Sequence, residues 1–267
     1  MAKHISELNY AFAVGKIRAT ERFLIKEEVF QEAISADLDS ALRLFVESGR
    51  YSDELLRVKN SLQIEEALEK EATKLKKLAS ELILEDDLLQ LLDLSSPQRL
   101  ESALAHCSHA FLKDYLMHLA DMHNIKTFLR LRILKEPQDV LIKHLVFAGF
   151  IKRETFIEVY PLELGVFLHR LEYVYNGSRL VDYAYFLREA IEIAQQKRSF
   201  IMLEKSINDF LIQALHPAKY LSFGPGPVLA YYFAKSNEIN LIRMIILAKL
   251  NNLPAELVQE RLNNVYA

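Results

Sequence analysis

The sequence predicts an all-α fold. Glycine and proline, which turn-rich β folds need, number only 7 each among 267 residues. Leu, Ala, Glu, Lys and Ile dominate the chain and favour helices. No segment shows the two-residue alternation of a half-buried strand. The length and an apolar content of 51% predict a sizeable core divided among two or three packed lobes.

Charge and cysteine content restrict the function classes. Lys and Arg total 33 against 36 Asp and Glu, so the net charge of −3 argues against a nucleic-acid binder. Cys107 is the single cysteine, which excludes an internal disulfide and fits a reducing compartment. No apolar signal core follows Met1, and the longest apolar runs are far shorter than the roughly 20 residues of a membrane span. We therefore expect a cytoplasmic chain that does not enter a membrane.

The first elements are expected to be helices. One helix is predicted from near Ser6 to about Lys26, and two short helices are predicted within residues 28–48 around Asp37. A break follows at residues 49–52, where a glycine precedes a polar turn.

A long helix is predicted after Asn60, which forms a capping box with Gln63. Its apolar residues recur at helical spacing: Leu68, Ala72, Leu75, Leu78, Ala79 and Leu82. The opposite face is charged, with Glu69, Lys70, Lys74, Lys76 and Lys77. We interpret it as a solvated face.

Further helices fill the rest of the chain. Ser96 is expected to cap the next helix, with Pro97 in its first turn. Later breaks are predicted at Gly149, Pro161, Asn176-Gly177, His216-Pro217, Phe223–Pro227 and Asn251–Pro254. Asn176-Gly177-Ser178 also matches a glycosylation sequon, which we interpret as a turn.

An internal repeat with an offset of 117 residues connects two of these helices. The aligned pairs include Asp121 with Glu238, Arg132 with Lys249, and Pro137 with Pro254. Eleven residues return to nearly the same helix face, so each apolar stripe has an acid at one end and a base at the other. The two charges lie about 16 Å apart, and each needs a partner elsewhere. We expect pairing across the helical hairpin or between lobes.

A weaker echo has an offset of 126 residues. It places Phe30, Leu38 and Leu42 on Phe156, Leu164 and Leu168. Because any two helical segments align this loosely, the echo carries little weight.

The sequence contains no recognisable catalytic or metal motif. The prolines of Gly224–Pro227 lack the N–H groups that a phosphate loop needs. The histidines between His106 and His123 lack a Glu-x-x-His pair, so they are expected to be surface or capping residues. We predict no cofactor, metal ligand or catalytic residue.

An acidic segment permits one enzymatic alternative. Asp86-Asp87-Leu-Leu-Gln90 superficially resembles the aspartate-rich motif of helical prenyl-diphosphate enzymes, in which carboxylates bind magnesium and diphosphate. Gln90 replaces the final aspartate and no second acidic motif follows. We interpret the cluster as a helix start.

Several segments resemble one known family. Phe223-Gly-Pro-Gly-Pro227, Glu238-Ile-Asn-Leu-Ile-Arg243 and Lys249-Leu-Asn-Asn-Leu-Pro254 closely resemble the end of the C subunits of V/A-type rotary ATPases, relatives of the vacuolar d subunit. Asp121–Arg130 is similar to the acidic-Asn-Leu/Ile-Lys helix of that family, and Tyr10–Arg22 to its opening helix. Members usually carry three copies of the acidic helix, whereas this sequence shows two, so its N-terminal lobe is expected to be abbreviated.

The resemblance implies a non-catalytic rotor subunit of the central stalk. It implies a funnel of repeated, pseudo-symmetric lobes that receives the central shaft and sits on the membrane rotor ring, peripheral to the membrane. The lobes are expected at residues 1–95, 96–165 and 166–267. The alternative hypothesis, from another functional class, is that the protein is a general helical-repeat adaptor outside any rotary ATPase.

The candidate partner contacts are basic residues beside the family motifs. They are Lys16, Arg18, Arg22, Lys126 and Arg130. An ordinary solvated face is the competing interpretation.

Overall fold

The structure, a computed structural model, describes residues 6–147, 149–175 and 180–267. The described chain divides into two compact units. Unit 1 combines both ends of the chain, up to Leu92 and from Ile212 onward, and unit 2 is the continuous stretch Asp93–Leu211. The three lobes expected from the family resemblance remain a prediction.

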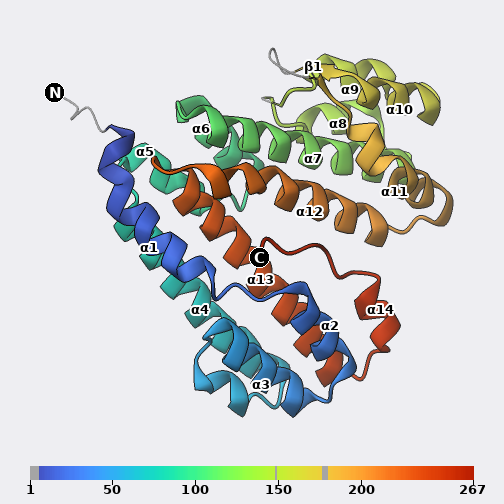
Figure 1. Ribbon diagram of the computed structural model, residues 1–267. Helices are drawn as coiled ribbons and strands as arrows, with labels where there is room; N and C mark the ends of the chain where they lie inside the picture. Colours follow the sequence, from blue (N-terminus) through green and yellow to red (C-terminus); the bar gives the residue numbers. More distant parts are fainter. Residues whose placement is uncertain (1–5, 148, 176–179) are drawn as a thin grey trace. The chain divides into compact units, whose positions relative to one another are not determined.

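Unit 1 is built from helices of very different lengths (Figure 1). Its elements are η1 (Glu7–Tyr10), α1 (Ala11–Glu21), α2 (Glu27–Ser35), α3 (Leu38–Gly49), η2 (Asp53–Arg57), α4 (Ser61–Leu82), α5 (Asp86–Leu89), η3 (Gln90–Leu92), η4 (His216–Tyr220), α13 (Gly226–Leu250) and α14 (Ala255–Gln259).

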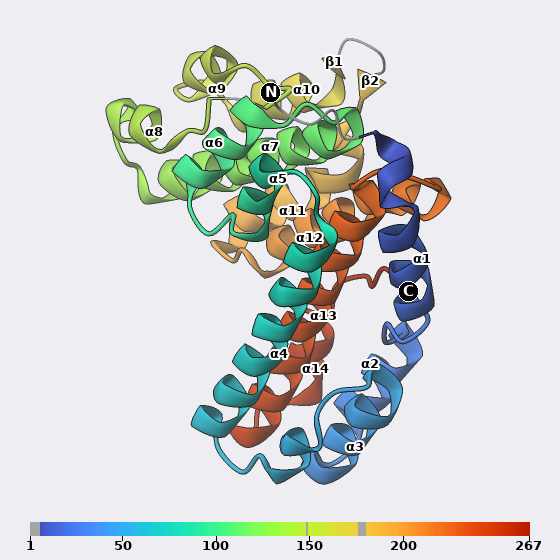
Figure 2. The ribbon, with the colours of Figure 1, turned by 90° about the vertical axis from the view of Figure 1, so that its left-hand side faces the viewer.

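The long helices α4 and α13 lie side by side and form the main packing contact of unit 1 (Figure 2). The predicted cap of α4 is present, because the Gln63 amide donates to Asn60 Oδ1 over 3.0 Å. Leu68 and Leu75 of the predicted stripe are buried, whereas Lys76 is exposed on the opposite face. The helix therefore has the amphipathic character that its sequence predicts.

Unit 2 contains the remaining helices and a small hairpin. Its elements are α6 (Pro97–His106), α7 (Ala110–Leu134), α8 (Gln138–His144), α9 (Arg153–Val159), α10 (Leu164–Glu172), β1 (Val174–Tyr175), β2 (Leu180–Val181), α11 (Tyr183–Lys197) and most of α12 (Ile201–Leu215). Ser96 caps α6 and Pro97 occupies its first turn, as predicted.

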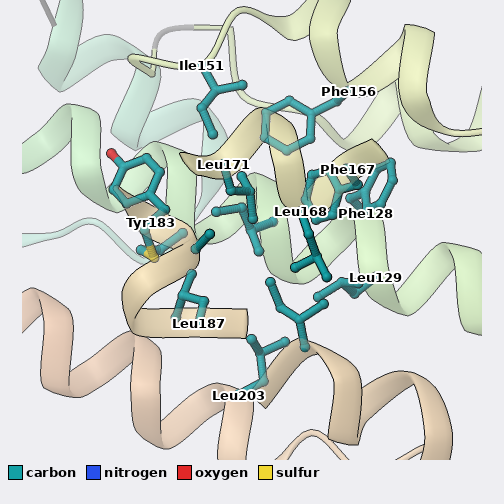
Figure 3. Packing of buried hydrophobic residues seen from close by; sticks show 14 of the residues in the cluster. Phe128, Leu129, Ile151, Phe156, Phe167, Leu168, Leu171, Tyr183, Leu187 and Leu203 are labelled. Carbon is teal, nitrogen blue, oxygen red and sulfur yellow. The ribbon is translucent and has the colours of Figure 1, made fainter. Parts of the chain in front are cut away.

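Aromatic side chains pack together in the hydrophobic core of unit 2 (Figure 3). Phe128 of α7 stacks on Phe167 of α10 with ring centroids 4.1 Å apart. Phe156 of α9 contacts both rings, and Leu187 and Leu203 are fully buried in the same cluster. Packing of this density fixes α9 and α10 against α7.

The predicted all-α character is confirmed, with one small addition. Val174 pairs antiparallel with Val181, and Tyr175 with Leu180. Strands of two residues are too short to show alternation, so no sequence pattern indicated them. The predicted turn at Asn176-Gly177-Ser178 lies outside the described residues.

Two helix boundaries differ from those predicted. The opening helix was expected to reach Lys26, but α1 ends at Glu21, and the chain then turns so that the Ile25 amide reaches a buried carboxylate. The irregular stretch at 223–227 is shorter than predicted, since α13 begins at Gly226. Pro227 fits there because the first turn of a helix needs no N–H donors.

Candidate functional site

Each unit buries one acidic residue in the middle of its longest helix. In unit 2 this residue is Asp121 of α7, with no exposed surface. Its carboxylate accepts hydrogen bonds from the amides of Phe150 at 3.0 Å and Ile151 at 3.1 Å, and from the hydroxyl of Tyr183 at 2.8 Å. Burial raises the pKa of Asp121 to about 7, although the three donors oppose that shift.

The surroundings of Asp121 extend this network. The Tyr183 hydroxyl lies 2.7 Å from Nδ1 of His118, which is buried in the middle of α7, so the expectation of a surface or capping histidine is wrong at this position. Gly149 approaches so closely that a Cβ atom placed there would lie 2.8 Å from Cγ of Asp121 and nearer still to Oδ1. A glycine is therefore required for the backbone donors at 150 and 151 to reach the carboxylate.

In unit 1 the equivalent acid is Glu238 of α13, also buried. It accepts from the Ile25 amide at 2.7 Å and from the Tyr51 hydroxyl at 2.6 Å, and it forms an ion pair with Lys235. Burial, followed by the nearby Glu238, raises the pKa of Tyr51 well above its usual value, so this hydroxyl remains a donor. The paired Lys235 and the two neutral donors satisfy a carboxylate that would be costly to bury alone.

The basic partner of each repeat secures a helix end. Arg132 donates to the carbonyl of Tyr160 at 2.8 Å, directly after α9. Lys249 donates to the carbonyl oxygens of Ile34, at 2.9 Å, and Ala36, at the end of α2. Burial lowers the pKa of Lys249. These cations satisfy carbonyl groups that the helix leaves without an internal donor.

The two sets of contacts share one spacing. Ile25 and Ile151, which donate to the acids, are separated by 126 residues, as are Ile34 and Tyr160, which accept from the bases. The short helices of the two sets also begin 126 residues apart. This holds for α2 and α9, and for α3 and α10, which come next in the chain. The weak sequence echo thus coincides with matched hydrogen bonds.

The candidate contact residues of the first helix lie in two environments. Lys16 and Arg22 are exposed and line a cleft of about 440 Å³ in unit 1. Arg18 is half-buried, pairs with Glu21 at 2.6 Å, and donates to carbonyls of the segment before α13. Its guanidinium is thus used to hold α1 in place.

The second candidate pair meets an acid of its own unit. Arg130 lies 2.7 Å from Glu204, and Lys126 lies 4.0 Å from the same carboxylate. Both cations remain partly exposed, so their contribution to stability is small.

Three cations that line the unit 1 cleft were not among the contact residues predicted from the sequence. Arg50, Lys74 and Lys235 join Lys16 and Arg22 around it. They come from α4, α13 and the residue after α3, so no local run of basic residues brings them together. Arg50 lies in the predicted break at residues 49–52 and takes a left-handed φ of 53°, which the sequence did not indicate.

The acidic segment at residues 86–87 is a helix start, as predicted. Asp86 and Asp87 are exposed in the first turn of α5. Within residues 6–147, 149–175 and 180–267, no group of three or more His, Cys, Asp or Glu side chains is placed to hold a metal ion. Gly224 takes a φ of +83°, and its amide donates to the Glu7 carbonyl, which explains the glycine without a phosphate loop.

No helix in the described part of the chain combines the length and apolarity needed to cross a membrane.

Comparison with known proteins gives two kinds of match. The model of the ATP synthase (C/AC39) subunit family matches residues 92–261, over half of the chain. The chain is 24% identical to the C subunit of the V-type sodium ATPase of Enterococcus hirae over 230 residues, covering 84% of this chain and 66% of that protein. It is 24% identical to the C subunit of the A-type ATP synthase of Methanocaldococcus jannaschii over 154 residues, covering 56% and 37%. The matched stretches thus span less than two thirds of either relative.

Proposed function

The chain belongs to the ATP synthase (C/AC39) subunit family, and on that basis we propose that it is a non-catalytic central-stalk subunit of a V/A-type ATPase. In this role it couples the central shaft to the membrane rotor ring. The family match over residues 92–261 is the observation that carries the proposal. ATP hydrolysis and ion passage would then belong to other subunits of the complex.

The buried charges support this role physically. A subunit that transmits torque through noncovalent contacts must deform little under load. Asp121 and Glu238 each receive donors from distant segments of their own unit, which tie short helices to the longest one. Close-packed interiors with satisfied polar networks have low compressibility, so each unit is suited to bear force.

The matched contacts further support a duplicated module. We propose that α13 with α2 and α3 forms one copy, and α7 with α9 and α10 the other. In both, an acid in the long helix accepts from an isoleucine amide and a tyrosine hydroxyl, and a base donates to the end of a short helix. The copies differ in chain order, because the donors precede the acid in unit 1 and follow it in unit 2. The funnel expected from the family resemblance would require such repeated lobes.

The decisive experiment is reconstitution of the ATPase with and without this chain, measuring ATP turnover and ion flux together. Without it, the catalytic head is expected to hydrolyse ATP while ion transport is lost, and adding the purified chain back should restore transport. Fully coupled ion transport in its absence would show that the proposed role is wrong. The purified chain alone should show no ATP turnover.

A further inference from the structure

The cleft of unit 1 carries an excess of positive charge that the fold does not use. Five basic side chains line it, Lys16, Arg22, Arg50, Lys74 and Lys235, and we call it the basic groove. Glu71 is the acidic residue among its lining residues. The chain as a whole has a net charge of −3, so this concentration is a local feature.

Two of the five cations already have carboxylate partners. Lys74 lies 2.7 Å from Glu71, and Lys235 pairs with the buried Glu238. Within the described residues, Lys16, Arg22 and Arg50 have no carboxylate in ion-pair distance. Three unneutralised cations around one cleft produce a positive potential that attracts an anionic partner.

One aromatic ring orients the two arginines. The guanidinium of Arg50 lies 3.4 Å from the centroid of the Phe23 ring, and that of Arg22 lies 4.6 Å from it. Stacking occupies the flat face of a guanidinium and leaves its N–H groups free at the edge, where they bind carboxylates in a bidentate manner. The groove therefore presents preorganised donors for acidic groups.

Part of the lining of the basic groove, its floor, is apolar and accessible. The exposed Ala19 of α1 and the partly exposed Leu78 of α4 contribute to it, whereas Leu75 and Ile239, which also line the groove, are buried. The lining extends from Glu71 to Leu78 along α4, which corresponds to about 10 Å at the rise of an α-helix. A free phosphate ion would leave this apolar surface uncovered, whereas two turns of a peptide helix would span it.

We propose that the basic groove binds an acidic amphipathic segment of another subunit of the complex, with its apolar side chains on Ala19 and Leu78 and its carboxylates on Lys16, Arg22 and Arg50. The proposal rests on the proposed function for the existence of that complex. Charge complementarity selects the acidic segment, and the apolar floor selects a peptide over a small anion.

The first test reverses the unpaired charges. The variant Lys16→Glu/Arg22→Glu/Arg50→Glu is compared with Lys59→Glu/Lys76→Glu/Lys77→Glu, which changes the net charge equally at exposed sites outside the groove. Binding of each purified chain to the ATPase lacking this subunit is measured at about 50 and about 300 mM salt. The groove variant should bind roughly ten- to hundredfold more weakly at low salt, and the control should bind within about threefold of the unmodified chain.

The double variant Lys16→Glu/Arg22→Glu keeps Arg50 and its stacking on Phe23, so a folding defect at position 50 cannot explain its loss of binding. It should lose part of the same affinity while keeping the helical circular dichroism of the unmodified chain. Equal affinity of the groove and control variants would overturn the proposal.

The second test locates the occupant. A photo-crosslinking residue replaces the exposed Ala19, which lines the groove, or Lys76, which does not, in the assembled ATPase. Mass spectrometry should place the Ala19 crosslink in a segment of another subunit where Asp or Glu alternate with apolar residues. Crosslinks to lipid, to a second copy of this chain, or to none of the other subunits would refute the proposal. If the chain does not assemble with the ATPase at all, the proposed function itself fails.

Discussion

Replacing Gly149 by alanine probes the buried carboxylate of unit 2 directly. The added methyl group would lie 2.8 Å from Cγ of Asp121 and closer to Oδ1, a separation that no relaxed Cβ contact shows. Asp121 has no exposed surface, so its side chain cannot escape to solvent. Either the carboxylate or the loop must move, and the bonds from Phe150 and Ile151 at 3.0 and 3.1 Å would lengthen.

The expected cost follows from these two bonds. Above the Asp121 pKa of about 7, where the carboxylate is charged, a hydrogen bond to it contributes about 1.5–3 kcal/mol, so weakening the pair should lower the free energy of unfolding by about 2–4 kcal/mol. Gly165→Ala in the same unit is the matched control, because a Cβ there meets no atom within 4 Å. Alanine in the middle of a helix stabilises by roughly 0.5–1 kcal/mol relative to glycine, and Gly165 lies in the first turn of α10, so Gly165→Ala should be neutral or stabilise by at most this amount while Gly149→Ala destabilises.

Urea unfolding followed by far-ultraviolet circular dichroism gives the free energies, and amide hydrogen exchange reports the two donors. The amides of Phe150 and Ile151 should exchange faster in Gly149→Ala than in Gly165→Ala. In an Asp121→Ala background, where no carboxylate remains to collide, Gly149→Ala should cost far less. A Gly149→Ala protein as stable as the unmodified chain, with both amides still protected, would refute this account of the glycine.

Three further outcomes are expected. Tyr51→Phe removes a hydroxyl donor to the buried Glu238, so thermal or urea unfolding should show a loss of about 1.5–3 kcal/mol; an unchanged midpoint would contradict the bond's importance. Burial raises the pKa of Asp121 to about 7, so between about pH 4 and pH 7 the native state holds a proton that the unfolded chain has released. The free energy of unfolding should therefore fall as the pH rises from about 4 to 7, by at most about 1.4 kcal/mol per pH unit. Urea titrations should show a flatter pH profile for Asp121→Asn, and an identical slope would assign the effect to another group. Lys249→Met leaves the carbonyls at the end of α2 without their donor and should destabilise by about 1–3 kcal/mol, whereas Lys76→Met at an exposed site should change stability by less than about 0.5 kcal/mol.

Local signals in the sequence predicted much of the helical framework. Asn60 and Ser96 act as caps because their side chains accept from amides three residues ahead, a contact that depends on neighbours alone. The short helices around Asp37 and the stripe of α4 follow from the same local rules. The boundary at Lys26 was wrong because the end of α1 depends on Glu238, more than two hundred residues away.

The buried charges were only half predictable. Their eleven-residue spacing predicted that an acid and a base share one helix face. It did not indicate which groups form hydrogen bonds with them. The donors to Glu238 come from Ile25 and Tyr51, and nothing near either residue indicates a distant carboxylate. The echo at offset 126 held that information, yet the apolar residues that carry it are common to many helices. Arg50 and Lys235 likewise meet in the basic groove only after folding.

The discontinuous composition of unit 1 has a consequence for synthesis on the ribosome. Helices α2, α3 and α4 emerge early, but α13, which supplies Glu238 and covers the apolar stripe of α4, is made after all of Asp93–Leu211. At about 5–20 residues per second, that insertion of about 120 residues takes roughly 6–24 seconds. Throughout this interval the nascent chain exposes the apolar helix faces of unit 1, and the Tyr51 hydroxyl lacks its carboxylate partner, while the helices of unit 2 are still being made. A chaperone that shields N-terminal helices would therefore act on unit 1 until α13 emerges, which happens only after the whole of unit 2 has been made.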